Sequence, residues 1–464
     1  MRNCVIAYLL GLMTLSYSDD NLYNKNNVVN GDNTITTPQI TTEYHVLDHW
    51  PAKDLQYGQV SSVSYDSFNL VYVFHRGDRV WDSDTFNANN VFRQKSRGPI
   101  PVDTVLLLDP NTGHLVRSWG RDMFYMPHGI TIDKQDNIWI TDVALHQVFK
   151  FPRLNATSPG SSDPSLTLGI PFTPGNSHKH FCKPTSVVVL RNGDFWVADG
   201  YCHSRLVKFS ADGVYLSQIG RSTMETGTLA PAPYHFSIPH SMALIEELNV
   251  LCVADRENGR LQCFDCHNGT FIKQIDSPTI GHKIYGVAYS QLNGGVLYVI
   301  NGPADFTPTV KIRGFTLDFP SSSILSTFGP SSGDGFGLPH DVIATMDGQR
   351  VYVAEIGANP RIWQFLRNDL NFTISSEIWT APVLQSSSSS FFTSPLLNTS
   401  AGESGGALVL AVLVISAVLL VGVSVLVASF VYTKATGGSG RSRRRRRAGS
   451  VEQLFLEETS TYVH

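Results

Sequence analysis

A six-fold internal repeat constrains the fold of this chain more than any other feature of its sequence. Each copy has an alternating apolar run, a turn around Asn, Gly or Asp, and a second apolar run. The four clear copies occupy residues 127–151, 184–209, 239–264 and 339–365, and two weaker copies occupy residues 59–81 and 285–303. Alternation of apolar and polar residues indicates half-buried β-strands, and similar strand groups at intervals indicate one propeller blade per copy.

Six copies therefore predict an all-β fold, a six-bladed β-propeller of the NHL-repeat type, over residues 45–372. Each blade of such a ring packs against its neighbours, and closure of the ring leaves few exposed strand edges. A pair of β-sandwiches would also bury alternating strands. That architecture does not require six similar copies, so we expect the propeller.

Both ends of the chain carry features of membrane targeting. Arg2 precedes an apolar run at residues 5–15, which is typical of a secretory signal peptide (residues 1–18) cleaved near Ser18. Residues 407–432 contain no charged residue and are long enough to cross a hydrocarbon core of roughly 30 Å as one transmembrane helix. Five consecutive arginines at 443–447 follow, so we expect a single-pass type I protein with a luminal or extracellular propeller.

The remaining segments fit this topology. Composition predicts a disordered leader at residues 19–44, a Ser-rich stalk at 373–406 and a cytosolic tail at 433–464. Location in the secretory pathway or in a secretory-vesicle membrane, or at the cell surface, follows from the signal peptide and the anchor. The net charge of −4, with the only basic block at the C-terminal end, gives no reason to expect a nucleic-acid partner.

Glycosylation sequons and cysteines agree with an oxidising compartment. All four sequons precede the predicted membrane helix: Asn155, Asn268, Asn371 and Asn398. Of six cysteines, Cys4 lies in the predicted signal peptide, and five remain in the luminal part. Disulfides are therefore expected with one thiol left over, but spacing alone does not determine the pairing.

Candidate metal ligands emerge when the copies are aligned on their first strands. The aligned position holds, in chain order, Ser61, His128, Thr185, His240, Tyr285 and His340. The first strand of each blade lines the central channel, and alternate blades are related by a third of a turn, so the three histidines should converge on the axis. Three neutral imidazoles with an open fourth position form catalytic zinc sites. A Pro-His tolerated by chance would explain one such histidine, but three in alternate blades favour a metal site.

The residues that follow the second strands should surround this site. They are Arg76, Tyr201 and Arg256. Two arginines suit an anionic substrate, because guanidinium groups pair bidentately with carboxylates, and a tyrosine beside Zn²⁺ and arginine could have a lowered pKa and act as a base. The alternative is that both arginines are structural and bridge blade turns through Asp199, Asp255 or similar residues.

Several strings of the repeat resemble the peptidyl-α-hydroxyglycine α-amidating lyase family. They are FHRGDRVW, MPHGITID, TDVALHQVFKF, HFCKPTSV, DGYCHSR, PHSMAL, CVADRENGRLQCF and PHDVIA, and the resemblance covers about residues 45–365. That family cleaves peptidyl-α-hydroxyglycine into a C-terminally amidated peptide and glyoxylate, the second step of peptide amidation. The active-site arginines of the family fall on Arg76 and Arg256, and its tyrosine falls on Tyr201. Our hypothesis is that zinc binds the substrate hydroxyl, Tyr201 takes its proton, and the two arginines hold the carboxylate.

The resemblance also assigns residues to metals and disulfides. The zinc ligands of the family fall on His128, His240 and His340. A structural Ca²⁺ falls on Val63, Ile130 and Asp341, as two backbone carbonyls and one carboxylate. The implied disulfides are Cys182–Cys202 and Cys252–Cys263, which leaves Cys266 unpaired. Leu338 departs from the family pattern, which has Met at this position, so a sulfur contact near the metal is in doubt.

Two other function classes stay open at this point. A calcium-dependent lactonase would use acidic and Asn ligands in the channel, and an NHL-type binding module at the cell surface would need no alternating histidines. Many animal members of the lyase family carry a copper monooxygenase domain upstream. Only about 25 residues separate the predicted signal peptide from the propeller here. We therefore expect a separate peptidylglycine monooxygenase to supply the substrate.

Overall fold

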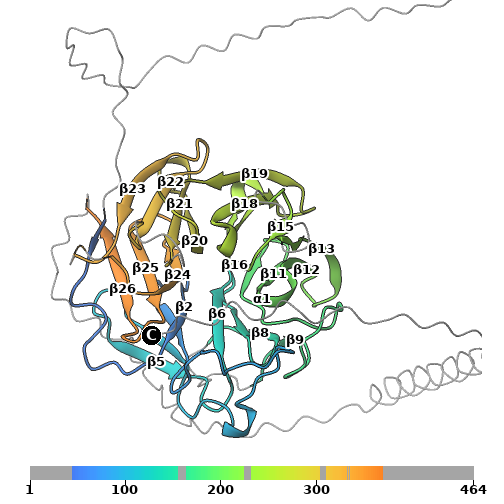
Figure 1. Cartoon of the computed structure of the whole chain (residues 1–464). Coiled ribbons are helices and arrows are strands. Elements are labelled where there is room, and N and C mark those ends of the chain that lie inside the picture. Colours follow the sequence, from blue (N-terminus) through green and yellow to red (C-terminus); the bar gives the residue numbers. More distant parts are fainter. Residues whose placement is uncertain are drawn as a thin grey trace, which may run out of the picture. The chain divides into compact units, whose positions relative to one another are not determined.

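The described part of the chain is a ring of six antiparallel sheets around a central axis (Figure 1). The computed structural model describes residues 44–154, 163–223, 231–303, 310–331, 333 and 335–368. Each sheet has four strands, which confirms the all-β, six-bladed propeller. Five predicted segments lie outside the described residues: the signal peptide, the leader (except its last residue, Tyr44), the stalk, the membrane helix and the tail. So do three of the sequons, Asn155, Asn371 and Asn398. Within these residues no helix is long and apolar enough to cross a membrane.

The first three blades follow one another along the chain, with the innermost strand first. Blade 1 contains β2 (Val60–Tyr65), β3 (Val71–His75), β4 (Val105–Leu108) and β5 (Leu115–Trp119). Blade 2 contains β6 (Pro127–Ile132), β7 (Ile138–Asp142), β8 (Gln147–Phe151) and β9 (Leu166–Leu168). Blade 3 contains β10 (Ser186–Val189), β11 (Phe195–Asp199), β12 (Arg205–Phe209) and β13 (Tyr215–Ile219).

The next two blades repeat this order. Blade 4 contains β16 (Pro239–Ile245), β17 (Val250–Asp255), β18 (Arg260–Asp265) and β19 (Phe271–Asp276). Blade 5 contains β20 (Ile284–Ser290), β21 (Val296–Asn301), β22 (Gly314–Asp318) and β23 (Ile324–Phe328). Short elements occur between strands: η1 (Lys95–Arg97), α1 (Gly200–His203), the parallel pair β14 (Arg221–Ser222) and β15 (His235–Phe236), η3 (Glu246–Leu248), η4 (Arg256–Asn258) and η5 (Leu292–Gly294).

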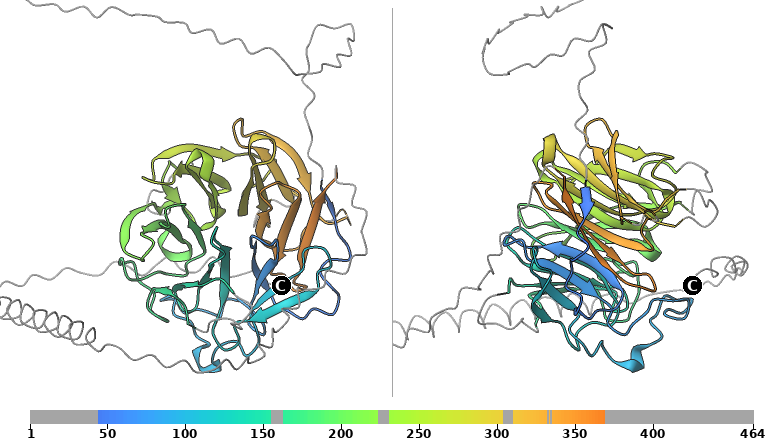
Figure 2. Two further views of the ribbon diagram at one scale, coloured as in Figure 1. Left: turned by 180° about the vertical axis from the view of Figure 1, so that it is seen from behind. Right: turned by 90° about the vertical axis from the view of Figure 1, so that its left-hand side faces the viewer.

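Blade 6 closes the ring with strands from both ends of the propeller. It contains β24 (Pro339–Ala344), β25 (Arg350–Glu355), β26 (Ile362–Arg367) and, as its outermost strand, β1 (Tyr44–Val46). The blue β1 lies beside the orange β26 in Figures 1 and 2. Tyr44 Oη donates a hydrogen bond to the Gly348 carbonyl at 2.6 Å and lies 2.8 Å from Tyr298 Oη of blade 5.

The burial of the strands explains the repeat pattern in the sequence. The second strand of each blade is packed between its neighbours on both faces, so β3, β7, β11, β17 and β21 are buried along their whole length. Outer strands face water on one side, and β13 and β19 show alternating burial. Apolar clusters fill the spaces between adjacent blades, for example where Trp139 of blade 2 contacts Phe195 of blade 3 at a ring-centroid distance of 4.5 Å. Packing between blades, rather than a single central core, therefore stabilises the ring.

Removal of β1 should destabilise the whole ring, because it exposes the edge of β26 and the apolar cluster that contains Tyr44 and Val46. We expect a protein that lacks residues 21–46 to lose about 3 kcal/mol of unfolding free energy relative to one that lacks only residues 21–41. Urea unfolding followed by circular dichroism measures the difference. Equal stability of the two proteins would contradict closure by β1.

Candidate metal centre and its surroundings

A β-bulge at the start of the inner strand aims one side chain of most blades at the axis. The pairing register between first and second strands shifts at Ser61, His128, His240, Tyr285 and His340. In blade 3 the equivalent Thr185 comes just before β10. A bulge leaves one residue unpaired and turns its side chain out of the regular alternation. The six aligned positions of the sequence are therefore also equivalent in the structure.

The three histidines form a buried, nearly equilateral triangle on the axis. Ring centroids of His128, His240 and His340 lie 4.9, 4.8 and 4.7 Å apart, and one ring nitrogen of each lies within 4.8 Å of the others. Each side chain is 2–3% exposed. Burial lowers the pKa of His240 to about 3 and that of the other two well below the usual value, so all three rings are neutral. The three offer lone pairs to one point, as a tetrahedral metal site with an open fourth position requires.

The odd-numbered blades orient the rings. His128 Nδ1 contacts the Thr185 carbonyl at 2.9 Å, His240 Nδ1 contacts the Tyr285 carbonyl at 2.7 Å, and His340 Nδ1 contacts the Ser61 carbonyl at 2.6 Å. A carbonyl accepts only, so each Nδ1 must carry the proton and each Nε2 must be the lone-pair donor. Among the described residues His240 Nε2 is buried without a hydrogen-bond partner. This donor set fits a zinc ion.

Buried acidic residues at the ends of the second strands hold the segments that lead into the histidines. Asp142 accepts the backbone N–H groups of Tyr125 and Met126 at 2.7 and 3.0 Å, just before His128. Asp255 accepts the N–H of Ser237 at 2.7 Å, and Glu355 accepts those of Gly337 and Leu338 at 2.6 and 3.0 Å. Burial raises the pKa of Asp142 and Asp255 against the opposing effect of these hydrogen bonds.

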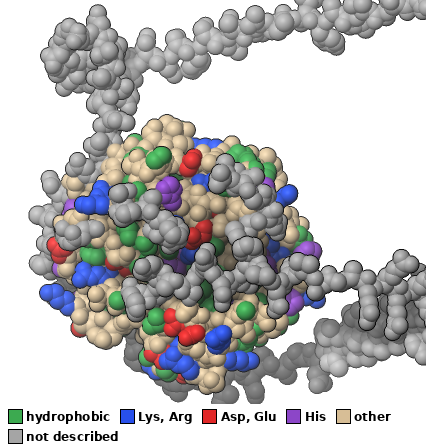
Figure 3. All heavy atoms as spheres, in the orientation of Figure 1, with side chains coloured by type: hydrophobic (Ala, Val, Ile, Leu, Met, Phe, Trp, Pro, Cys, Tyr) green, Lys and Arg blue, Asp and Glu red, His purple; other side chains and the backbone are tan. Residues whose placement is uncertain are grey.

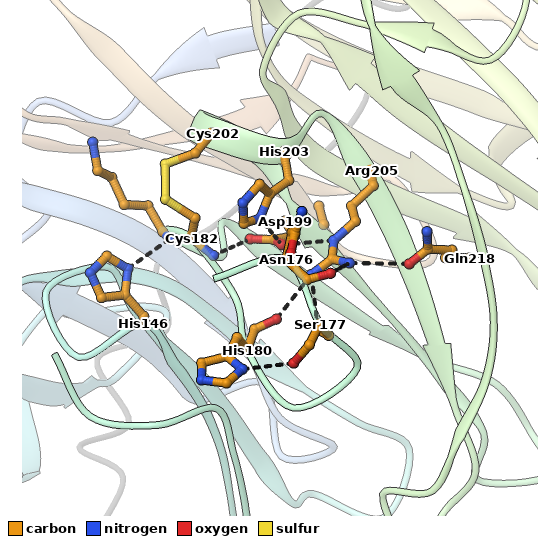
Figure 4. A network of polar contacts seen from close by, with 12 residues as sticks. His146, Asn176, Ser177, His180, Cys182, Asp199, Cys202, His203, Arg205 and Gln218 are labelled. Carbon is orange, nitrogen blue, oxygen red and sulfur yellow. Dashed lines mark hydrogen bonds and ion pairs between the residues drawn. A yellow bond between two sulfur atoms is a disulfide. The ribbon is translucent and has the colours of Figure 1, made fainter. Parts of the chain in front are cut away.

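Figure 4 shows the same arrangement in blade 3. The Asp199 carboxylate lies between the Cys182 amide, at 2.6 Å, and the side chains of His203 and Arg205, at 2.8 and 2.9 Å. The disulfide Cys182–Cys202 joins this segment to α1. Tyr201 therefore lies on a turn that is fixed from both sides.

Tyr201 connects the histidine triangle to Arg256. Its Oη lies 3.1 Å from His128 Nε2, and Arg256 Nη1 donates to the same oxygen at 3.4 Å. Gly200 permits this placement, because a Cβ there would lie 2.4 Å from the Pro239 carbonyl of the next blade. Burial raises the pKa of Tyr201 in spite of the two nearby arginines. The lowering of this pKa was expected beside a bound Zn²⁺ and stays a prediction.

Arg76 lies beside the site, and one of its guanidinium nitrogens has no hydrogen-bond acceptor among the described residues. Its Nε donates to the Pro127 carbonyl at 3.0 Å and Nη1 donates to Gln59 Oε1 at 2.9 Å, while Nη2 is buried and lacks a partner among the described residues. The side chain is 1% exposed. An unpaired buried guanidinium N–H is costly unless a ligand accepts from it.

Asp199 and Asp255 pair with arginines other than Arg76 and Arg256. Asp199 pairs with Arg205 at 2.9 Å and Asp255 pairs with Arg260 at 2.8 Å. Arg256 instead pairs with Glu257 at 2.8 Å. Arg76 binds the Pro127 carbonyl of blade 2, so a structural role for the two arginines through other partners stays an alternative.

The residues predicted for calcium lie together inside the channel, on the side of the triangle away from Tyr201. Ser62 Oγ contacts the Asp341 carboxylate at 2.5 Å and the Ile130 carbonyl at 3.5 Å, and the Val63 N–H donates to the same carboxylate at 3.3 Å. All four residues line a cavity of about 560 Å³ that continues along the axis. Burial raises the pKa of Asp341 to about 6. A cation would favour the ionised carboxylate.

The cysteines pair as the family resemblance implies. Cys182 bonds to Cys202, Cys252 bonds to Cys263 across β17 and β18, and Cys266 is a buried free thiol.

Leu338 is half-buried, and its N–H donates a hydrogen bond to Glu355. Of the four sequons only Asn268 is described, at an exposed position of the β18–β19 turn. On the face drawn in Figure 3, acidic and basic side chains are interspersed.

Comparison with known proteins agrees with this geometry. A sequence model of the NHL repeat matches residues 124–151, 181–209 and 236–264, which belong to blades 2, 3 and 4. The chain is 40% identical over 333 residues to peptidyl-alpha-hydroxyglycine alpha-amidating lyase 2 of Drosophila melanogaster, covering 69% of this chain and 75% of that protein. It belongs to the peptidyl-α-hydroxyglycine α-amidating lyase family.

Two further relatives show how much of a related protein the match spans. Lyase 1 of Drosophila melanogaster is 45% identical over 349 residues, covering 72% of this chain and 63% of the relative. Peptidyl-glycine alpha-amidating monooxygenase B of Xenopus laevis is 45% identical over 317 residues, covering 68% of this chain and 35% of the relative. The chain thus spans less than two thirds of these two proteins.

Sequence reasoning located the aligned histidines, Tyr201 and the arginines, but it missed residues that orient them. Gln59 Oε1 accepts from Arg76 and, at 3.4 Å, from the N–H of Trp81, whose ring lies 4.8 Å from that of Tyr201. Neither residue belongs to an aligned position, so the repeat gave no signal for them. The carbonyls of Ser61, Thr185 and Tyr285 did lie in the aligned position, and this could have suggested their role.

Two further buried histidines, His75 and His146, should make stability depend on pH. Each Nδ1 accepts a backbone N–H at 3.0 Å, from Gly77 and Lys183 respectively, and burial lowers the pKa of each to about 4. Because the folded pKa lies below the unfolded value of 6.5, the stabilisation is fully present above pH 6.5 and is lost as pH falls towards 4.

We expect His75→Asn to flatten this dependence by up to about 1.4 kcal/mol per pH unit, because the unfolded state then takes up one proton fewer. Asn suits the position, since Asn301 occupies the equivalent end of β21. Urea unfolding between about pH 7 and pH 4 measures the slope. His114→Asn, at an exposed turn, is the control, and parallel curves for wild type and His75→Asn would refute the assignment.

Proposed function

We propose that this protein is a zinc-dependent lyase that cleaves peptidyl-α-hydroxyglycine into a C-terminally amidated peptide and glyoxylate. The observation that carries the proposal is the buried triangle of His128, His240 and His340 with Tyr201 Oη at 3.1 Å from one ligand nitrogen. Membership of the lyase family supports the reaction class. Arg76 and Arg256 suit the free carboxylate that distinguishes this substrate from its amide product.

The triangle would hold the catalytic metal through three Nε2 atoms. Bound Zn²⁺ would act as a Lewis acid towards the substrate hydroxyl and lower its pKa. The carbonyls of Ser61, Thr185 and Tyr285 would keep the rings in the required tautomer and orientation.

The arginines would orient the substrate. The α-carboxylate can accept from the unpaired Nη2 of Arg76 and from the guanidinium of Arg256, whose Nε is fixed by Glu257. Both groups are largely removed from water, so charge-assisted hydrogen bonds to them are strong. A carboxylate held there places the neighbouring hydroxyl and amide nitrogen beside Tyr201.

Tyr201 would move the proton. In the reaction the C–N bond breaks and its electron pair leaves on nitrogen, while the O–H electron pair forms the aldehyde C=O of glyoxylate. One proton passes in total from the hydroxyl oxygen to the amide nitrogen. A phenol can accept the first proton while it donates its own to nitrogen, so a raised pKa of Tyr201 is compatible with this role.

The wider setting is also part of the proposal. A structural Ca²⁺ would be held by Asp341 and the carbonyls of Val63 and Ile130. A type I protein of the secretory pathway, anchored by residues 407–432, is supported by the signal-like N-terminal segment and by two disulfides, which persist in oxidising compartments. A peptidylglycine monooxygenase would supply the hydroxylated substrate.

The first test measures glyoxylate release from a synthetic peptidyl-α-hydroxyglycine by the purified protein. We expect a strong chelator to abolish release, Zn²⁺ to restore it, and His240→Ala to lower kcat/KM by more than about a hundredfold, because one metal ligand is lost. His267→Ala, at an exposed turn, is the matched control.

The alternatives give different outcomes in the same assay. Release that resists the chelator would refute the zinc role. Absence of release from folded, zinc-loaded protein would favour a binding module, and hydrolysis of lactones restored by Ca²⁺ alone would favour a lactonase.

The second test addresses the proton relay. Tyr201→Phe keeps the ring packing but removes the hydroxyl, so we expect kcat to fall by about 10² or more with a smaller change in KM. Tyr215→Phe, on the outer strand β13, is the control. Near-normal turnover of Tyr201→Phe would show that another group moves the proton.

A further inference from the structure

Two aromatic rings, those of Trp81 and Phe86, form a wall beside the candidate metal centre, and 'the wall' below means these two residues. Trp81 and Phe86 belong to the long connection between β3 and β4, and their ring centroids lie 5.2 Å apart. Trp81 lies 4.8 Å from Tyr201 and 6.3 Å from His128. The wall is half-buried, so part of its surface is open to a ligand.

A lysine without an anionic partner lies against this wall. Lys183 Nζ is 4.3 Å from the Phe86 ring centroid, 5.8 Å from that of Trp81 and 5.9 Å from that of Tyr201. Across the residues that the structure describes, no carboxylate lies within 4 Å of this ammonium group and no hydrogen bond from it is present. The other lysines that lie over a Trp, Lys150 and Lys208, belong to the third strands of their blades, away from the axis.

The backbone of Lys183 is held firmly. Its N–H donates to His146 Nδ1 at 3.0 Å, and its φ of 61° is in the left-handed region, which non-glycine residues rarely occupy. The preceding Cys182 forms a disulfide with Cys202, and its backbone N–H donates a hydrogen bond to the Asp199 carboxylate (Figure 4). A left-handed lysine that the surroundings fix in place beside a candidate active site suggests a role in binding.

The position of the wall determines which part of a substrate can reach it. Tyr201, Arg76 and Arg256 follow the second strands, whereas Ser62, Val63 and Asp341 line the channel on the other side of the triangle. A substrate whose carboxylate is held by the arginines therefore lies on the side of the wall. Its peptide chain extends away from the axis, and the residue before the α-hydroxyglycine is the first to pass the rings.

We propose that Phe86, Trp81 and Lys183 form a subsite for the residue that precedes the α-hydroxyglycine and that it selects acidic and aromatic side chains over basic ones. This inference rests on the proposed lyase function. Ring faces bury apolar and aromatic side chains, and an unpaired ammonium attracts a carboxylate and repels a second cation. Cation–π contacts hold Lys183 in the wall when no anion is bound.

The test compares kcat/KM of the full-length protein for peptides with Glu, Phe or Lys before the α-hydroxyglycine. We expect the Glu peptide to be preferred over the Lys peptide by about fivefold or more, Lys183→Gln to abolish this preference, and Lys183→Glu to reverse it. Phe86→Ala should lower kcat/KM for the Phe peptide by about fivefold relative to the Glu peptide. Lys273→Glu makes the same charge change at a lysine over the Phe319 ring, on the outermost strand β19, and should leave all ratios unchanged.

N-acetyl-α-hydroxyglycine separates this inference from the proposed function, because it has no preceding residue. Wild type, Lys183→Gln and Lys183→Glu should cleave it at similar rates. If all three cleave it but the Glu-to-Lys ratio is the same in each, the subsite is refuted. If wild type releases no glyoxylate from any substrate, the proposed function itself fails.

Discussion

The site depends on one repeated interaction, in which a buried side chain at the end of the second strand binds the backbone that leads into the inner strand. Blades 2, 3, 4 and 6 use Asp142, Asp199, Asp255 and Glu355 for this purpose. In blade 1 the Nδ1 of His75 accepts the N–H of Gly58 at 3.4 Å and that of Gly77. Because the bonded segment precedes the aligned residue by only a few positions, this interaction fixes the point at which each bulge turns a side chain to the axis.

Because of that geometry, alternate blades contribute different groups at the aligned position. Even-numbered blades supply an imidazole at the aligned position, and odd-numbered blades supply the backbone carbonyl that binds its Nδ1. A three-fold set of imidazoles thus arises within a six-fold ring without any contribution from a loop. The inner strands have little freedom, since each packs against both neighbours, so the ring nitrogens of the three histidines are held close together.

The residues proposed to bind the substrate, by contrast, lie on segments that differ between blades. Tyr201 lies on α1, Arg256 on η4, and Arg76 at the start of the long β3–β4 connection. The Cys182–Cys202 disulfide and the Asp199 network stiffen one of these segments (Figure 4). Many proteins place binding groups on variable turns that a rigid scaffold positions, and the proposed site follows this pattern.

The sequence by itself determined the number of blades, the three histidines and their convergence, and the positions of Tyr201, Arg76 and Arg256, because a repeat makes local patterns equivalent and symmetry then fixes their relation in space. It did not determine closure of blade 6 by β1, since the three residues Tyr44–Val46 carry too little pattern to show a partner more than 300 residues away. Nor did it predict that Asp199 and Asp255 bind Arg205 and Arg260, or that burial raises the pKa of Tyr201. Those outcomes depend on which polar groups meet once water is excluded, and only tertiary packing decides that.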